Sequence, residues 1–268
     1  MKVLFPTDFS ENAELAAEFA IDIAKRTKGS IVAFHAYDVP YSERSMTTSL
    51  LHEMKDIAHK HMQEFEAKVL SSSGVDFQTQ VSLGNPIRLS KELCEKHNID
   101  IVVLGTKGAS GIEELLIGSN AASVIQNIDT PVLVIPPNSQ VKEIKNIVLA
   151  TDMDLRKKER PLLRLKAFAN IYGAKINILH FQDDRGVKEG SRDFLETHLS
   201  DVPHSYAVLA QKDNLDKDIL EYCQSKNADM VTAITKRYGF FEGLFRSSLT
   251  SKLAYHTNIP MLALHEPK

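Results

Sequence analysis

The chain of 268 residues is longer than one average domain and can hold two domains of about 130 residues. Its 43% hydrophobic and 25% charged residues are ordinary for a globular protein. A net charge of −3 gives no broad basic face, which argues against a nucleic-acid-binding protein. Two cysteines, Cys94 and Cys223, are too few for a disulfide framework. No signal peptide or membrane-spanning run is recognisable, so we expect a cytoplasmic location.

Short apolar runs alternate with helix-like segments along the first half of the chain. Ser10 predicts the N-cap of the first helix, and Pro86 is typical of the first residue of another. The strands are expected at residues 2–5, 30–36, 77–83, 101–104 and 131–135. The helices are expected at residues 12–28, 50–73, 86–97 and 119–127. This alternation predicts a parallel sheet with helices on both faces, in a doubly wound, flavodoxin-like α/β domain.

The fourth expected strand runs into a glycine-rich stretch, GTKGASGIEELLIGS, which spans residues 105–119. Gly105, Gly108 and Gly118 stand in it, and Ser119 opens the next helix. Glycines between a strand and a helix let backbone N–H groups converge on a phosphate. A flexible surface loop is the alternative. Ligands in doubly wound sheets bind beyond the carboxyl ends of the strands, where Asp8, Ala36 and Gly105 are expected, so the position favours a nucleotide site.

The pattern starts again after a linker at residues 136–139, which predicts an internal duplication with domains at 1–138 and 143–268. Thr7-Asp8 recurs as Thr151-Asp152 and His35 recurs as His180, each about 144 residues later. Later in each half the spacing falls to about 129 residues, because the second half has a shorter segment after its second strand. At this spacing the pairs are Cys94 and Cys223, Asn98 and Asn227, Asp100 and Asp229, Thr106-Lys107 and Thr235-Lys236, and Pro131 and Pro260.

The second half lacks the glycines. Ile234, Arg237 and Ser247 occupy the positions of Gly105, Gly108 and Gly118. Since the fold pattern persists without the glycines, we expect that they serve a ligand rather than the fold, at one site per chain.

These residues resemble the universal stress protein family, in its ATP-binding branch and its tandem form. The resemblance rests on the segment from Pro6 to Ser10, on His35-Ala36, on the glycine spacing through Ser119, and on the closing segment from Thr130 to Ile135. It covers both halves, strongly in the first and weakly in the second. It implies two tandem Rossmann-like domains, each with a five-stranded parallel sheet in the order 3-2-1-4-5.

The resemblance also implies a binding site for ATP with Mg²⁺ or Mn²⁺. Asp8 would contact the ribose hydroxyls, backbone at Ala36 would meet the adenine edge, and amides of the glycine stretch would hold the phosphates. The residues assigned to this site are Pro6, Thr7, Asp8, His35, Ala36, Leu104, Gly105, Thr106, Lys107, Gly108, Gly118, Ser119, Asn120 and Ala121. The family pattern often has a hydroxyl residue where this chain has Ala121, so one phosphate contact is in question.

Several of these residues also have simpler interpretations. Asp8 is typical of a turn or a helix cap, and its counterpart Asp152 persists without the glycines. His35 and His180 are more simply explained as histidines satisfied within the sheet. Cys94 and Cys223 are best explained as small buried side chains, and Lys107 and Lys236 either touch phosphate or face solvent. His52, His59 and His61 do not share one helix face, which argues against a metal site there.

Three functions follow from these patterns. The first is an ATP-binding regulatory protein of the stress response, with nucleotide in the first domain only. The second is a slow ATPase or a nucleotide-alpha-hydrolase-like enzyme, which lacks a recognisable base and nucleophile near the glycines. The third is an interaction protein without nucleotide. In this family the sheet edge formed by the closing strand pairs two domains, and in this chain that strand is expected at residues 132–135 and 261–264. We therefore expect the two domains of one chain to form a pseudo-dimer. A homodimer of chains is a further assembly to test.

Overall fold

The computed structural model describes residues 1–38, 48–106, 119–140, 143–153, 159–182, 190–210, 214–235 and 249–266. The chain separates into two compact units, of which the first ends at Pro137 and the second begins at Asn138. We call them the N-terminal unit and the C-terminal unit and describe each by itself. Residues 107–118, which form most of the expected phosphate loop, lie outside the described residues.

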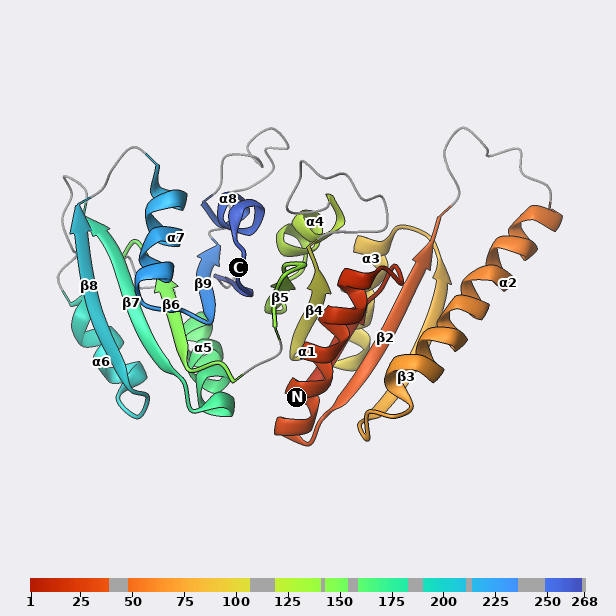
Figure 1. Ribbon diagram of the computed structural model, residues 1–268, viewed down its shortest axis with the longest axis horizontal. Coiled ribbons are helices and arrows are strands. Elements are labelled where there is room, and N and C mark those ends of the chain that lie inside the picture. The colour runs from red at the N-terminus through yellow and green to blue at the C-terminus, as the bar shows by residue number, and fades with distance from the viewer. Residues whose placement is uncertain are drawn as a thin grey trace. The chain divides into compact units, whose positions relative to one another are not determined.

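The N-terminal unit contains five parallel strands in the order β3-β2-β1-β4-β5 (Figure 1). This confirms the predicted order 3-2-1-4-5. The strands are added in one direction from β1 to β3 and in the opposite direction from β4 to β5, so the order reverses between the neighbours β1 and β4. Val3, Leu4 and Phe5 of the central strand are buried, as expected for a strand covered on both faces. The strands are β1 (Lys2–Pro6), β2 (Ser30–Tyr37), β3 (Asp76–Leu83), β4 (Ile101–Gly105) and β5 (Val132–Ile135).

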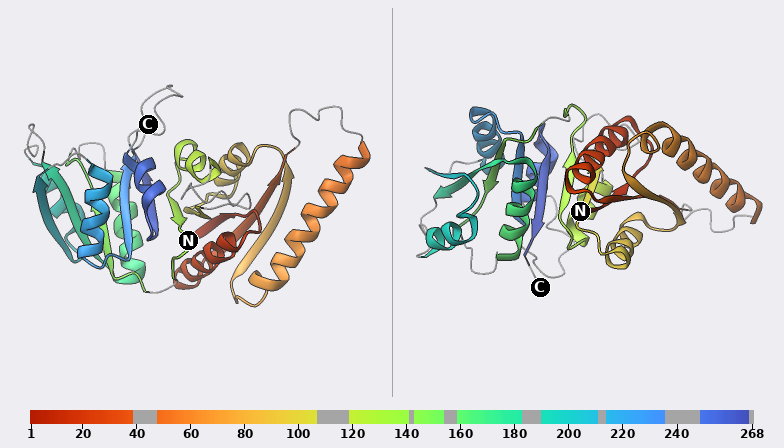
Figure 2. Two further views of the ribbon diagram at one scale, coloured as in Figure 1. Left: turned by 45° about the horizontal axis from the view of Figure 1, so that its top comes forward. Right: turned by 90° about the horizontal axis from the view of Figure 1, so that it is seen from below.

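Helices cover both faces of this sheet. Two of them, α1 and α2, lie on one face and α3 lies on the other, where it packs against α4 (Figure 2). The helices are α1 (Glu11–Thr27), α2 (Thr48–Phe65), α3 (Pro86–His97) and α4 (Ser119–Asn127). The prediction of one α-helix through residue 73 was wrong in detail, because α2 ends at Phe65 and a short π-helix, η2 (Glu66–Leu70), follows it.

The predicted first helix has the cap that its sequence indicates. The Ser10 hydroxyl accepts a hydrogen bond from the backbone N–H of Ala13 at 3.2 Å, and Pro86 opens α3 behind an Asn85 cap. One face of α1 is buried, including Phe19 and Ile23, so the helix is fixed on the sheet by its amphipathic pattern.

The C-terminal unit repeats this topology, with five parallel strands in the order β8-β7-β6-β9-β10 (Figure 1). Helix α5 packs on α6, and α7 packs on α8. The strands are β6 (Asn146–Ala150), β7 (Lys175–Gln182), β8 (His204–Ala210), β9 (Met230–Thr235) and β10 (Met261–His265). The helices are α5 (Glu159–Tyr172), α6 (Ser191–Leu199), α7 (Leu215–Ser225) and α8 (Leu249–His256).

Local backbone geometry supports the internal duplication inferred from sequence. Asn98 ends α3 with φ of 50°, and its counterpart Asn227 follows α7 with φ of 48°. After the first strand of each unit, Phe9 has φ of 65° and its counterpart Met153 has φ of 57°. Residues other than glycine seldom adopt this left-handed conformation, so its recurrence at matched positions indicates one inherited backbone path.

The first helix of each unit ends with the same turn but with a different residue. Lys28 takes φ of 50° after α1, whereas the matching residue after α5 is Gly173, with φ of 62°. A side chain costs about 1 kcal/mol in this conformation. We therefore expect Lys28→Gly to raise the free energy of unfolding of the N-terminal unit by about 1 kcal/mol, and Gly173→Lys to lower that of the C-terminal unit similarly.

Urea denaturation of both variants and the wild type measures these two shifts. A Cβ at Gly173 would meet no atom within 4 Å, so the second substitution tests backbone strain without a clash. Two shifts of the same sign would contradict the prediction.

Candidate functional site

The segment after β1 forms a tightly bonded turn at the carboxyl edge of the N-terminal sheet. The backbone N–H of Thr7 donates to the Phe34 carbonyl at 2.8 Å, and the Thr7 hydroxyl accepts from the N–H of Phe9 at 3.0 Å. The Asp8 carboxylate accepts from the N–H of Ser10 at 3.1 Å and from its hydroxyl at 2.7 Å. Asp8 is exposed on this turn, so its carboxylate is held at the surface above the end of β1.

His35 fixes the same turn to β2. Its Nδ1 lies 2.8 Å from the Thr7 carbonyl, which can only accept, so Nδ1 carries the hydrogen. The ring of Phe9 packs on the imidazole with centroids 4.4 Å apart. Burial lowers the pKa of His35, although the bond to Thr7 and the charge of Asp8 act in the opposite direction. In the C-terminal unit, His180 makes the matching contact with Thr151 at 3.1 Å, which supports a structural role for both histidines.

Gly105 ends β4 beside the first turn of α1. A Cβ at this position would lie 2.6 Å from Oδ1 of Asn12 and 3.0 Å from its backbone oxygen. Asn12 is itself buried, and its side-chain amide donates to the Ile135 carbonyl at 3.1 Å. The expectation that the glycines are unnecessary for the fold is therefore wrong for Gly105, because its missing side chain lets helix and strand approach.

Thr106 follows Gly105 and is 1% exposed. Its backbone N–H donates to the Ile135 carbonyl at 3.0 Å, which continues the pairing of β4 with β5. Ser119 and Asn120 open α4, and Ala121 is buried there. The remaining predicted site residues of the glycine stretch, Lys107, Gly108 and Gly118, lie outside the described residues.

The described site residues therefore share one edge of the sheet. Pro6, Thr7 and Asp8 come from the end of β1, His35 and Ala36 from the end of β2, and Leu104, Gly105 and Thr106 from the end of β4. These strands are neighbours in the sheet, and β1 and β4 flank the point where the strand order reverses. Asn12 also belongs to this edge and was missed from sequence, where its polar side chain among the apolar positions of α1 was the available signal.

The carboxyl edge of the C-terminal unit differs in detail. Ile234 stands where the N-terminal unit has Gly105 and pairs with Leu264 of β10. At the next position, the Thr235 hydroxyl donates to the hydroxyl of Thr250 in α8 at 3.3 Å. At this edge the C-terminal unit thus has Ile234 where the N-terminal unit has Gly105. It also has the hydroxyl of Thr250 where the N-terminal unit has Ala121.

Neither cysteine has the properties of a reactive thiol. Cys94 and Cys223 are both buried, and burial raises their thiol pKa values to about 11 and about 12. Within the described ranges, no three His, Cys, Asp or Glu side chains are grouped to hold a metal ion. Over the same ranges, none of the helices is both long enough and apolar enough to cross a membrane.

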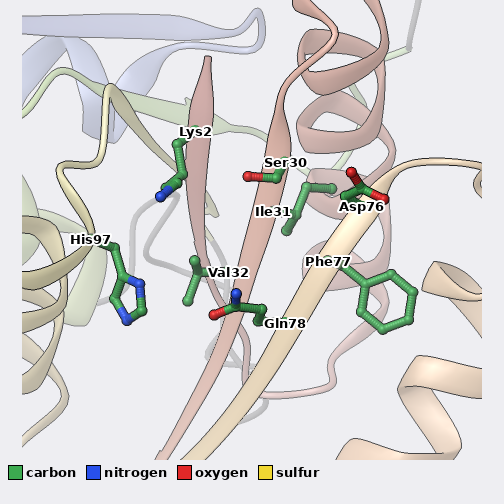
Figure 3. A pocket seen from close by; sticks show the side chains of 8 residues that line it. All are labelled: Lys2, Ser30, Ile31, Val32, Asp76, Phe77, Gln78 and His97. Carbon is green, nitrogen blue, oxygen red and sulfur yellow. The ribbon is translucent and has the colours of Figure 1, made fainter.

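Two hollows lie away from the predicted site. One, of about 70 Å³, lies at the amino ends of β1, β2 and β3, where the imidazole of His97 and the amine of Lys2 lie on one side (Figure 3). It is far smaller than a nucleotide pocket. The other, of about 590 Å³, belongs to the C-terminal unit and is lined by Lys217, Leu220, Glu221, Cys223, Gln224, Asn227, Ala228, His256, Asn258 and Ile259.

Known proteins resemble this chain in sequence and in fold. The model of the universal stress protein family matches residues 1–136. A universal stress protein of Methanocaldococcus jannaschii is 36% identical over 141 residues, which cover 50% of this chain and 81% of that protein. A second one from that archaeon is 26% identical over 152 residues and is covered to 93%. The crystal structure of a universal stress protein from Archaeoglobus fulgidus matches this chain with a TM-score of 0.80 and 18% sequence identity. The match covers 100% of this chain and 97% of the Archaeoglobus chain, which shows a common fold.

Proposed function

Because the chain belongs to the universal stress protein family, we propose that its N-terminal unit binds ATP at the carboxyl ends of β1, β2 and β4. The observation that carries the proposal is the position of Asp8, Ala36 and Gly105 at one edge, where the strand order reverses. In doubly wound sheets this is the place where the crevice for a ligand opens. The glycine spacing from Gly105 to Ser119 starts at the same edge.

The chemistry of this edge fits the parts of a nucleotide. The exposed Asp8 carboxylate would accept hydrogen bonds from ribose hydroxyls, and the backbone at Ala36 would meet the adenine edge. The Thr106 N–H already donates to the Ile135 carbonyl, so the backbone amides of the glycine stretch after Thr106, with the amino end of α4, would hold phosphate oxygens. A divalent cation such as Mg²⁺ or Mn²⁺ would accompany the phosphates and offset their charge.

The role that we propose is regulatory. Nucleotide binding stabilises the liganded unit by mass action, and this is sufficient for a protein that reports nucleotide level during stress. The C-terminal unit, in which Ile234 replaces Gly105, is proposed to bind no ATP. The proposal contains no chemical step.

Isothermal titration with Mg-ATP tests this assignment, since we expect one ATP per chain. Asp8→Ala is expected to weaken binding about tenfold, because a charged acceptor is lost. Asp152→Ala, at the same position of the C-terminal unit, is the matched control and should leave the affinity unchanged. Two molecules of ATP per chain, no binding, or equal losses in the two variants would each refute the assignment.

A further inference from the structure

The hydroxyl of Thr106 is buried beside the proposed phosphate site without a partner. Thr106 is 1% exposed, and its Oγ1 makes no hydrogen bond with any of the described residues. The backbone N–H of the same residue is fully used in its bond to the Ile135 carbonyl at 3.0 Å. A buried hydroxyl without a partner is costly, so its persistence calls for an explanation.

The C-terminal unit shows what this hydroxyl does when a partner is present. Thr235 is the counterpart of Thr106, and its hydroxyl donates to that of Thr250 at 3.3 Å. Thr250 is 5% exposed and lies in the first turn of α8. The counterpart of Thr250 in the N-terminal unit is Ala121, which is 3% exposed and lies in the first turn of α4. A methyl group cannot accept a hydrogen bond, so Ala121 leaves Thr106 unpaired.

We infer that the Thr106 hydroxyl donates directly to a phosphate oxygen of the bound nucleotide, and that Ala121 keeps this donor available. This inference rests on the proposed function. Thr106 directly follows β4, and the glycine stretch leads from it to α4, a helix of nine residues whose amino end favours an anion. Phosphate oxygens are strong acceptors, which suits a donor that has no protein partner. In the C-terminal unit the same donor is already occupied by Thr250.

Calorimetric titration of the full chain with Mg-ATP tests this contact through three substitutions. Thr106→Val removes the hydroxyl at nearly constant volume and is expected to weaken binding about tenfold. Thr106→Ser keeps the hydroxyl and should bind more tightly than Thr106→Val. Ala121→Thr supplies the partner that the C-terminal unit has, and it should also weaken binding.

Urea denaturation without nucleotide gives a second measurement on the same proteins. Thr106→Val should leave the midpoint unchanged or raise it, because the removed hydroxyl has no partner in the protein. Thr235→Val, the matched control, breaks the pair with Thr250 and should lower the midpoint while leaving the ATP affinity unchanged.

The outcomes separate the two proposals. If the wild-type protein binds no ATP, both the proposed function and this inference are refuted. Wild-type protein that binds ATP, together with a Thr106→Val variant that binds equally well, would refute this inference alone. A loss of stability in Thr106→Val as large as that in Thr235→Val would also refute it, because the hydroxyl would then have a protein partner.

Discussion

Replacing Gly105 with alanine is expected to lower the free energy of unfolding of the N-terminal unit by about 2–4 kcal/mol in the absence of nucleotide. The new Cβ would lie 2.6 Å from Oδ1 and 2.9 Å from Cγ of Asn12, closer than van der Waals contact allows. Asn12 cannot simply turn away, because it is buried and its amide donates to the Ile135 carbonyl. Relief therefore requires either the loss of that bond or a shift of α1 from β4.

A double-mutant cycle separates these two costs. Asn12→Ala alone removes the bond to Ile135 and is expected to cost about 1 kcal/mol. In the double variant the two contacts with the Asn12 side chain are gone, while the contact of 3.0 Å with the backbone oxygen of residue 12 remains. We therefore expect Gly105→Ala to cost less in the Asn12→Ala background than in the wild type.

Urea denaturation monitored by circular dichroism gives the four free energies of this cycle. The control is Gly74→Ala, at a glycine with φ of 71° where a Cβ would meet no atom within 4 Å, so its cost reflects backbone strain alone. A Gly105→Ala variant as stable as the wild type would show that this glycine serves only a ligand.

Most of the fold could be predicted from the sequence because its strands are buried on both faces. Such strands appear as apolar runs, as at Val3–Phe5 and Val132–Ile135, and turn residues mark their ends. The duplication then fixed the topology of the second unit from that of the first. The end of α2 could not be predicted, since the change to a π-helix at Glu66 has no distinctive sequence pattern.

The candidate site was predictable by position but not in its contacts. Alternation of strands and helices placed Asp8, Ala36 and Gly105 at one edge, because parallel strands end on the same side. The reason for a glycine at 105 depends on Asn12, which is distant in sequence and approaches only in the folded unit. The unpaired hydroxyl of Thr106 could be recognised only in the structure, since a sequence does not show which hydroxyls form hydrogen bonds.

Replacing Asp229 with alanine is expected to lower the free energy of unfolding of the C-terminal unit by about 2 kcal/mol. Its carboxylate oxygen accepts from the backbone N–H groups of both Lys145 and Asn146, each at 2.9 Å, and so fixes the start of β6. Asp100, its counterpart, accepts from the N–H of Lys2 at 2.7 Å and is exposed, so Asp100→Ala should cost less, about 1 kcal/mol.

This pair of variants also tests whether the units unfold independently. Hydrogen exchange followed by mass spectrometry resolves peptides from each unit, and exchange through unfolding reports the stability of the unit that contains the peptide. We expect Asp229→Ala to speed exchange in β6, β7 and β9 while β1, β2 and β4 keep their protection, and Asp100→Ala to do the reverse. Equal acceleration in both sets of strands would show that the two units unfold as one cooperative body. A substitution in either unit would then lower the free energy of the single unfolding transition that exposes the buried amides of both.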